Sequence, residues 1–276
     1  MRKKRQLYPV IRYVVLTAAT LIAICPFLVL PIVSFKTKSE FLKYPLTLPS
    51  SINFQNYITV LERSNILMAF ANSMIITGGS VVLEVLVGTL AAYAITKMDF
   101  KHAGKFSIAF LIPMIFPIQT ITIPVYIIFR NLGLVNTHLG MIIIYGAVGL
   151  PIVVFMMTSF MKTIPYEISE SAVVDGASNF TIYRKLILPL LKPVISTVAV
   201  ICGLSVWNDF YIPMIMLTST GKKTLPLKVY DFLGQYTSDW TLVCTCIIYV
   251  IVPIMIFYCI LQKNIISGIA AGAVKG

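Results

Sequence analysis

Two acidic residues lie inside long apolar stretches of the sequence, where ionisable side chains are costly and mark candidate functional sites. Glu84 is one, and Asp209 is the other, with Trp207, Asn208 and Tyr211 beside it. Aromatic faces stack on sugar rings, and amides and carboxylates bind hydroxyl groups, so this grouping suits a path for a saccharide. An alternative is that Asn208 and Asp209 brace helix ends while Trp207 anchors the chain at a membrane interface. The candidate path residues are Glu84, Gln119, Trp207, Asn208, Asp209 and Tyr211.

Groups for catalysis or metal binding are not found in the sequence. No nucleophile lies near a base in a recognisable pattern, and His102 and His138 both fall at loop edges. The five cysteines all lie in apolar stretches, where cysteine behaves as a small hydrophobe, and their spacings fit neither a zinc site nor a disulfide framework. The phosphate-binding pattern GxxxxGK[ST] is also absent. We therefore expect no catalytic residue, no metal and no cofactor in this chain.

The least apolar segment of the interior is ESAVVDGASN, residues 170–179. Its acids, glycine and small side chains have little affinity for an anionic membrane surface. Small side chains also allow another protein to approach closely. An amphipathic loop on the lipid headgroups is the alternative, but the composition favours a docking helix.

Capping signals predict a helix, a turn and a second helix over residues 162–189. We expect Thr163 to cap the first helix, with Pro165 in its first turn. Gly176 is placed to end that helix in a left-handed conformation, and Ser178 can cap the second helix. Ile182, Leu186 and Leu190 are predicted to share one face of the second helix.

The remaining sequence must place these segments in a membrane. Only 12% of the 276 residues are charged, against about 25% in soluble domains. A helix needs about 20 apolar residues to cross a bilayer. We found no convincing internal repeat, so residues 1–276 are predicted to form a single all-α transmembrane domain. Its six expected spans are residues 11–34, 68–96, 105–129, 139–161, 190–217 and 241–262.

The net charge of +12 comes from Lys and Arg that cluster just outside the apolar runs. Such a pattern sets membrane orientation rather than binding nucleic acid. With the N-terminus in the cytoplasm, fourteen of the 22 basic residues fall on the cytoplasmic side. The sequence therefore predicts that both termini and residues 162–189 are cytoplasmic.

The segment 162–189 resembles the EAA loop of binding-protein-dependent ABC importer permeases. That pattern is Glu-Ala-Ala, three residues, Gly, nine residues, and Ile-x-Leu-Pro. The chain carries it as Glu170-Ser171-Ala172, Gly176 and residues 186–189, with Ser171 and Leu186 as conservative departures. The Trp207–Phe210 stretch and the Gly–Ala tail at 268–276 are similar to the maltose-type subunit of the carbohydrate-uptake branch. The resemblance runs from about residue 11 to the end.

The resemblance implies a type I ABC importer permease of a bacterial inner or plasma membrane. Its implied partners are a second homologous permease, two ATPase subunits that bind ATP and magnesium, and an extracytoplasmic sugar-binding protein. Glu170, Ser171, Ala172, Asp175, Gly176 and Ala177 would then couple the bundle to an ATPase. Gly272 and Lys275, in the tail, would contact the ATPase pair. The implied cargo is an oligosaccharide.

Two alternatives remain at this stage. The same architecture also imports polyols or glycerol phosphate, although a phosphate ester favours a basic residue facing the path. The other alternative is an ion-coupled secondary transporter with Glu84 and Asp209 at its centre. That alternative leaves the EAA-like loop without a purpose.

Overall fold

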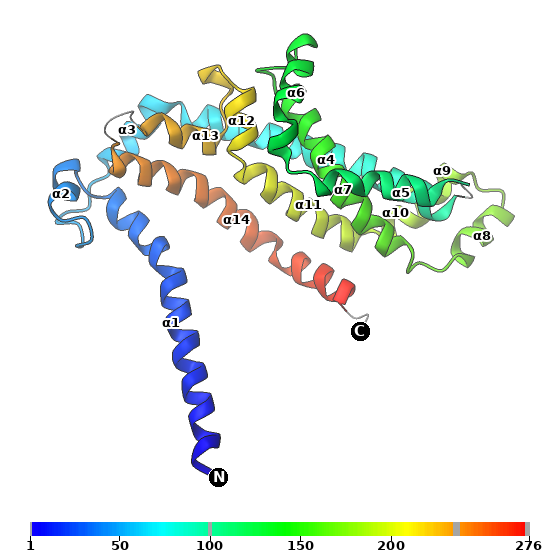
Figure 1. Cartoon of the computed structure of the whole chain (residues 1–276), viewed down its shortest axis with the longest axis horizontal. Helices are drawn as coiled ribbons and strands as arrows, with labels where there is room; N and C mark the ends of the chain where they lie inside the picture. Colours follow the sequence, from blue (N-terminus) through cyan, green and yellow to red (C-terminus); the bar gives the residue numbers. More distant parts are fainter. Residues whose placement is uncertain (1, 99–100, 234–237, 274–276) are drawn as a thin grey trace. The chain divides into compact units, whose positions relative to one another are not determined.

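A computed structural model describes residues 2–98, 101–233 and 238–273 of the chain, with side chains described from residue 11 to residue 259 of these ranges (Figure 1). Over the described residues the protein is helical and contains no β-strand. The chain forms two compact units. The first unit comprises residues 1–67 and 228–253, and the second comprises residues 68–227 and 254–276.

The first unit contains α1 (Arg2–Ser34), α2 (Lys38–Lys43), α3 (Gln55–Ser64), a 3₁₀ turn (Tyr230–Phe232) and the beginning of α14 (Trp240–Ala273). Lys36, which follows α1, is completely buried. Its ammonium donates hydrogen bonds to the carbonyl oxygens of Tyr44 (2.5 Å) and Pro45 (3.3 Å) and to the Thr47 hydroxyl (3.2 Å). A buried charge requires such partners, so Lys36 holds the segment after α2 against the end of α1.

The second unit is built mainly on α4 (Ile66–Lys97), α7 (His138–Met161) and α11 (Lys192–Asn208). Gly79 and Gly88 of α4 and Gly146 and Gly149 of α7 have no room for a Cβ atom, because side chains of the facing helix occupy the space. Small residues at a helix interface let backbones approach closely in membrane proteins. The α4–α7 pair is therefore a tightly packed centre.

The other elements of this unit are α5 (Ala103–Leu111), a 3₁₀ turn (Ile112–Ile115), α6 (Ile118–Asn131), α8 (Glu167–Val174), α9 (Asn179–Ile182), a π-turn (Tyr183–Ile187), α10 (Leu188–Leu190), α12 (Tyr211–Met216), a 3₁₀ turn (Thr220–Lys222) and α13 (Leu225–Val229).

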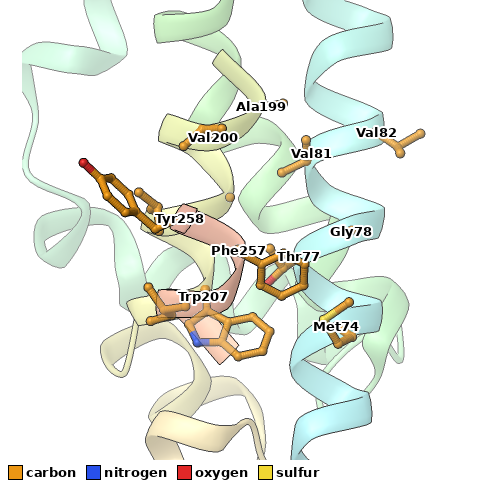
Figure 2. Close-up of a pocket in the computed structure, with 13 residues that line it drawn as sticks. Met74, Thr77, Gly78, Val81, Val82, Ala199, Val200, Trp207, Phe257 and Tyr258 are labelled. Carbon is orange, nitrogen blue, oxygen red and sulfur yellow. The ribbon is translucent and has the colours of Figure 1, made fainter. Parts of the chain in front are cut away.

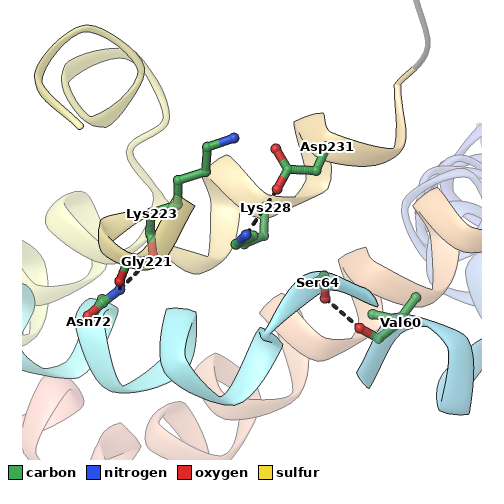
Figure 3. Close-up of polar contacts among 7 residues, drawn as sticks. All are labelled: Val60, Ser64, Asn72, Gly221, Lys223, Lys228 and Asp231. Carbon is green, nitrogen blue, oxygen red and sulfur yellow. Dashed lines mark hydrogen bonds and ion pairs between the residues drawn. The ribbon is translucent and has the colours of Figure 1, made fainter. Parts of the chain in front are cut away.

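The segment after α12 is fastened to the beginning of α4. The Asn72 amide donates hydrogen bonds to the carbonyl oxygens of Gly221 (2.9 Å) and Lys223 (3.0 Å), as Figure 3 shows. The Asn72 carbonyl oxygen pairs with His138 Nε2 (2.9 Å), at the first residue of α7. Three segments distant in sequence are thus joined through one side chain.

Helix length and composition agree with a chain that crosses a membrane several times. Among the described residues, four helices are long and apolar enough on their own: residues 11–34, 66–97, 138–161 and 240–259. Two further bent pairs pass the same test, which gives six if each pair is one span. The six predicted spans overlap these four helices and two pairs, but the second pair covers residues 179–208, whereas the predicted span is 190–217.

The predicted spans 105–129 and 190–217 are each interrupted in the structure. In the first, α5 and α6 meet at 102° across a turn that contains Pro113 and Pro117. In the second, the helix bends by 75° between Leu190 and Lys192 and stops again at Asn208. Prolines remove backbone donors, and the peptide groups that they free need other partners. Counting apolar residues does not detect such breaks.

Candidate functional site

The predicted docking segment forms a helical hairpin at one end of the second unit (Figure 1). Its first helix, α8, ends at Val174 and is followed by Gly176 at φ +77°, in the left-handed region that favours glycine. The N–H of Ala177 donates to the Ala172 carbonyl (2.9 Å), and the N–H of Gly176 donates to the Val173 carbonyl (3.0 Å). This pair of bonds is a Schellman motif, which closes the end of a helix. The prediction that Gly176 ends the helix in a left-handed conformation is confirmed.

The second helix of the hairpin begins as predicted, with the Ser178 hydroxyl accepting a hydrogen bond from the Thr181 N–H (3.3 Å). The predicted start of the first helix is wrong. Thr163 donates to the Phe160 carbonyl at the end of α7 instead of capping α8. α8 begins at Glu167, two residues after Pro165, and no side chain caps it.

The predicted face of the second helix is also partly wrong, because a π-turn follows α9. A π-turn has a wider repeat than an α-helix, which rotates the buried face. Ile182 is buried as expected, but the buried positions that follow are Tyr183, Ile187 and Leu191. Leu190, predicted to share the face, is exposed.

The hairpin presents a small polar surface with an apolar tip. Glu170, Ser171, Asp175 and Gly176 are exposed, while Ala172 and Ala177 are half-buried. Hollows of about 380 Å³ and 420 Å³ flank α8 on its two sides. Sequence reasoning missed the apolar part of this surface, in which Val174 is 87% exposed, Phe180 is 64% exposed and Val173 is 57% exposed.

A row of polar side chains on α4 is bonded to the hairpin. The Thr89 hydroxyl pairs with the Tyr183 hydroxyl (2.8 Å), and the Tyr93 hydroxyl donates to the Asn179 carbonyl (3.2 Å). The Lys97 ammonium donates to the Ile164 carbonyl (2.6 Å). We call Thr89, Tyr93 and Lys97 the α4 ladder. Its members are four residues apart and therefore share one face of the helix.

The sequence contained a signal for the ladder, since three hydrogen-bonding side chains recur every fourth residue in the mainly apolar last third of α4. Tyr166, just before α8, completes the contact. Its hydroxyl donates to the Lys97 carbonyl (3.1 Å), and the Lys97 ammonium lies 5.0 Å from the centre of its ring. The hairpin is thus attached to α4 at both of its ends.

A polar cavity of about 410 Å³ lies elsewhere in the second unit. It brings together five of the six candidate path residues, which come from α4, α6, the end of α11 and α12: Glu84, Gln119, Asn208, Asp209 and Tyr211. Tyr145 and Ser205 also line it. The described residues that line this cavity include no Lys, Arg or His.

Asp209 braces the break between α11 and α12. Its Oδ1 accepts from the Tyr211 N–H (2.9 Å), and its Oδ2 accepts from the Ile212 N–H (3.2 Å) and from the Tyr145 hydroxyl (2.8 Å). Asn208 donates to the Leu204 carbonyl (2.9 Å) within α11. The bracing role weighed for Asp209 in the sequence is therefore present, and it accompanies the position of Asp209 on the cavity wall.

Comparison with known proteins identifies the family to which the chain belongs. Residues 84–269 match the family described as "Binding-protein-dependent transport system inner membrane component". The chain belongs to this family. It is a multi-pass membrane permease, a transport component and not an enzyme.

The permease is similar over nearly its whole length to curated proteins named for sugar transport. It is 35% identical over 256 residues to a probable starch degradation products transport system permease protein of Thermoanaerobacterium thermosulfurigenes, with 93% of each chain covered. It is 34% identical over 253 residues to the melibiose/raffinose/stachyose import permease protein MelC of Bacillus subtilis, with 91% of each covered. It is 35% identical over 279 residues to the multiple sugar-binding transport system permease protein MsmG of Streptococcus mutans, with 100% of each covered.

The fold is also shared with a solved transporter. One chain of a bacterial ABC transporter involved in the import of the acidic polysaccharide alginate superposes with a TM-score of 0.64. The match covers 97% of the permease and 98% of that chain, at 17% sequence identity. At this identity the likeness shows the fold alone, which is that of an ABC importer permease.

Trp207 lies apart from the other candidate path residues of the permease. Its ring is buried and forms edge contacts with Phe70 (5.9 Å between centroids) and Phe257 (6.1 Å). Figure 2 shows it in an apolar pocket of about 320 Å³ between α4, α11 and α14, where Met74 and Phe257 also lie. Consecutive residues of a helix point about 100° apart, so Trp207 and Asn208 line different pockets.

The two predicted tail contacts lie at the limit of the described chain. Gly272 is in the last turn of α14, and Lys275 lies outside the described residues. Within the part of the permease that the structure describes, no group of three or more His, Cys, Asp or Glu side chains could hold a metal ion.

Proposed function

We propose that the permease is one membrane-spanning half of an ATP-driven importer of a neutral oligosaccharide. The observation that carries the proposal is the exposed hairpin, closed by a Schellman motif at Gly176 and attached to α4 by the ladder. A rigid, solvent-facing hairpin bonded to a spanning helix is suited to transmit the movement of a partner into the membrane. The family match and the sugar-related names of its relatives support this assignment.

In this proposal the hairpin docks in a groove of a cytoplasmic ATPase. The contact residues are Glu170, Ser171, Ala172, Asp175, Gly176 and Ala177. ATP and magnesium bind in two ATPase subunits, a homologous permease forms the other half of the path, and an extracytoplasmic binding protein delivers the sugar. Both termini of the permease are cytoplasmic in a bacterial inner or plasma membrane. The tail around Gly272 and Lys275 then reaches the ATPase pair.

The cavity supports a neutral, hydroxyl-rich cargo. Its wall contains two carboxyl side chains, amides and tyrosines, and the described lining has no basic group. An anion in such a site meets like charges without a compensating partner. Glycerol phosphate is therefore a poorer cargo than a neutral sugar.

Co-purification from native membranes tests the proposal. The permease is tagged at its N-terminus, solubilised gently, and its partners are identified by mass spectrometry. A homologous permease and an ATPase with a GxxxxGK[ST] sequence are expected. In Gly176→Trp, a large side chain strains the left-handed backbone and covers the surface of the hairpin, so the ATPase is lost while the permease stays in the membrane.

Gly104→Trp is the matched control, because Gly104 is exposed in α5, has open space around its Cβ position and has an ordinary backbone conformation. It should retain the ATPase. A permease that purified alone, or with an ATPase that Gly176→Trp did not release, would contradict the proposal. Purification alone would favour the ion-coupled transporter.

A further inference from the structure

The connection between α2 and α3 carries large apolar side chains that the chain itself leaves uncovered. Between Phe41 and Leu61 the only charged residue is Lys43. We call residues 42–52 the leucine segment. Four of its apolar side chains are 70–78% exposed: Leu42, Leu46, Leu48 and Ile52. Such a concentration of exposed apolar side chains marks a contact with a membrane or with another protein.

Several polar groups of the leucine segment are bonded within the protein and not left to water. The buried Lys36 ammonium donates to the carbonyl oxygens of Tyr44 and Pro45. The Glu40 carboxylate accepts a hydrogen bond from the Ser50 N–H (2.7 Å). In contact with lipid, backbone groups need partners inside the protein, because lipid supplies none. The segment thus combines internally bonded backbone groups with outward-facing leucines.

On its N-terminal side, the leucine segment is attached to the beginning of a spanning helix. The Lys38 ammonium pairs with the Asp239 carboxylate (3.7 Å). Asp239 directly precedes Trp240, the first residue of α14 and of its candidate span. In Figure 1, α2 lies beside the start of α14 and the end of α1. This contact holds α2 at one end of two spanning helices.

On its C-terminal side, the segment is attached still further along α14. The Tyr57 hydroxyl of α3 pairs with the Ser34 hydroxyl at the end of α1 (2.8 Å). Its ring packs against the ring of Tyr249 (5.9 Å between centroids), whose hydroxyl donates to the Tyr57 carbonyl (3.5 Å). Tyr249 is nine residues after Trp240, which is about 13 Å along a helix axis. The leucine segment therefore lies between two attachments to the membrane-crossing part of the chain.

We propose that the leucine segment is a membrane anchor, in which Leu42, Leu46, Leu48 and Ile52 insert into the bilayer at the boundary between lipid headgroups and acyl chains. The inference goes beyond the proposed function, because it concerns neither the cargo nor the ATPase.

The residues beside the leucines fit a lipid partner better than a protein partner. Lys43 and Tyr44 are both exposed. A lysine at this depth extends its ammonium to the headgroups while its methylene groups stay among apolar neighbours, and tyrosine is enriched at the membrane interface. Contacts between proteins are instead enriched in aromatic residues, methionine and arginine, and leucine is under-represented at their energetic centres.

Photocrosslinking in native membranes identifies what covers the segment. In cells that produce the complete importer, Leu46 is replaced by the photoreactive residue p-benzoylphenylalanine. After irradiation, the tryptic peptide of residues 44–63 is examined by mass spectrometry for attached phospholipid or protein. The matched control carries the same replacement at Val174 of the cytoplasmic hairpin, which is also apolar and exposed but lies outside the candidate spans.

We expect phospholipid to be the main product at position 46, at least about fivefold more abundant than at position 174. Crosslinking of position 46 mainly to a companion permease or to a binding protein would overturn the anchor and assign the segment to a protein interface. Equal lipid attachment at the two positions would also overturn it.

Proteolysis provides a second measurement. Trypsin is added to right-side-out and to inside-out vesicles, and the new N-terminus at Tyr44 reports cleavage after Lys43. Insertion should keep this cleavage slow. Replacing two inserted leucines in the double variant Leu46→Ser/Leu48→Ser removes much of the apolar contact, so cleavage on the accessible side should become roughly tenfold faster.

Thr47→Ser is the matched control for proteolysis, because it lies between the two leucines and keeps the hydroxyl that accepts from Lys36. It should be cleaved at the wild-type rate. Equal cleavage of the wild type and the double serine variant would overturn the anchor. The crosslinking measurement decides the question where the double variant does not fold.

Discussion

The ammonium of Lys97 donates a 2.6 Å hydrogen bond to the carbonyl oxygen of Ile164, 67 residues later in the chain. Lys97 is the last residue of α4, and Ile164 lies just before the docking hairpin. The same ammonium is above the ring of Tyr166, whose hydroxyl bonds back to the Lys97 carbonyl. This reciprocal clamp joins a spanning helix to the entrance of the hairpin, so a displacement of α8 must act on α4.

Removing the clamp should uncouple the importer without dismantling it. In Lys97→Met the ammonium is lost while the aliphatic part of the side chain is kept. A hydrogen bond to a charged group contributes about 1.5–3 kcal/mol, so we expect sugar uptake per ATP hydrolysed to fall roughly tenfold. The measurement compares uptake with binding-protein-stimulated ATP hydrolysis in proteoliposomes.

Two controls separate coupling from assembly. Lys97→Arg retains a donor and a cation and should keep most of the coupling, and Lys105→Met removes an exposed lysine of α5 and should change nothing. The ATPase should co-purify with all three variants. Coupling equal to wild type in Lys97→Met would show that the clamp has no part in transmission.

The cap at Ser178 fixes the second helix of the hairpin. Ser178→Ala removes the acceptor for the Thr181 N–H, which costs about 1 kcal/mol at a typical N-cap. We expect weaker binding of the purified ATPase and faster hydrogen exchange over residues 178–183. Ser178→Asp supplies another capping oxygen and should restore both. Failure of Ser178→Asp to restore exchange protection would mean that the hydroxyl acts through another contact.

The sequence predicted those parts of the hairpin in which a residue acts on its near neighbours in the chain. Gly176 and Ser178 act on residues within a few positions of themselves, so their types and spacing were sufficient. The prediction that Thr163 caps α8 was wrong because α7 continues to Met161, which leaves the Phe160 carbonyl as a nearer hydrogen-bond partner for Thr163. The π-turn after α9 left no recognisable signal, and it displaced Leu190 from the predicted face.

Contacts between distant segments were less accessible to sequence reasoning. The stretch Trp207–Asp209 was read as one group, although neighbouring positions on a helix face different directions. In the structure Trp207 lines an apolar pocket, whereas Asn208 and Asp209 line the polar cavity. The partner of Lys97 could not be found from the sequence, because tertiary packing alone brings residue 164 to the end of α4.

The bond between Tyr145 and Asp209 should stabilise the helix break rather than select the cargo. Tyr145→Phe removes the hydroxyl that donates to Asp209 Oδ2. Hydrogen bonds inside membrane proteins contribute about 0.6 kcal/mol on average, so we expect a small drop in thermal stability in detergent. Relative uptake rates for different sugars should stay as in wild type. In a double-mutant cycle, Tyr145→Phe and Asp209→Asn should be non-additive, whereas simple additivity would argue against a shared interaction.

The position of Glu84 depends on the absence of a side chain at Gly149. A Cβ atom at Gly149 would overlap Oε1 and the carboxyl carbon of Glu84, so Gly149→Ala must displace that carboxyl group. Overpacking of this kind typically costs about 1–3 kcal/mol, and we expect a lower thermal stability of the permease in detergent. The control is Gly203→Ala in α11, where the nearest atom to a new Cβ would be 3.7 Å away, an ordinary contact. Because the clash is with Glu84 itself, Gly149→Ala should add little further loss of stability to Glu84→Ala. If the double variant lost as much additional stability as Gly149→Ala does alone, the new methyl group would be disturbing the α4–α7 packing and not the Glu84 carboxyl group.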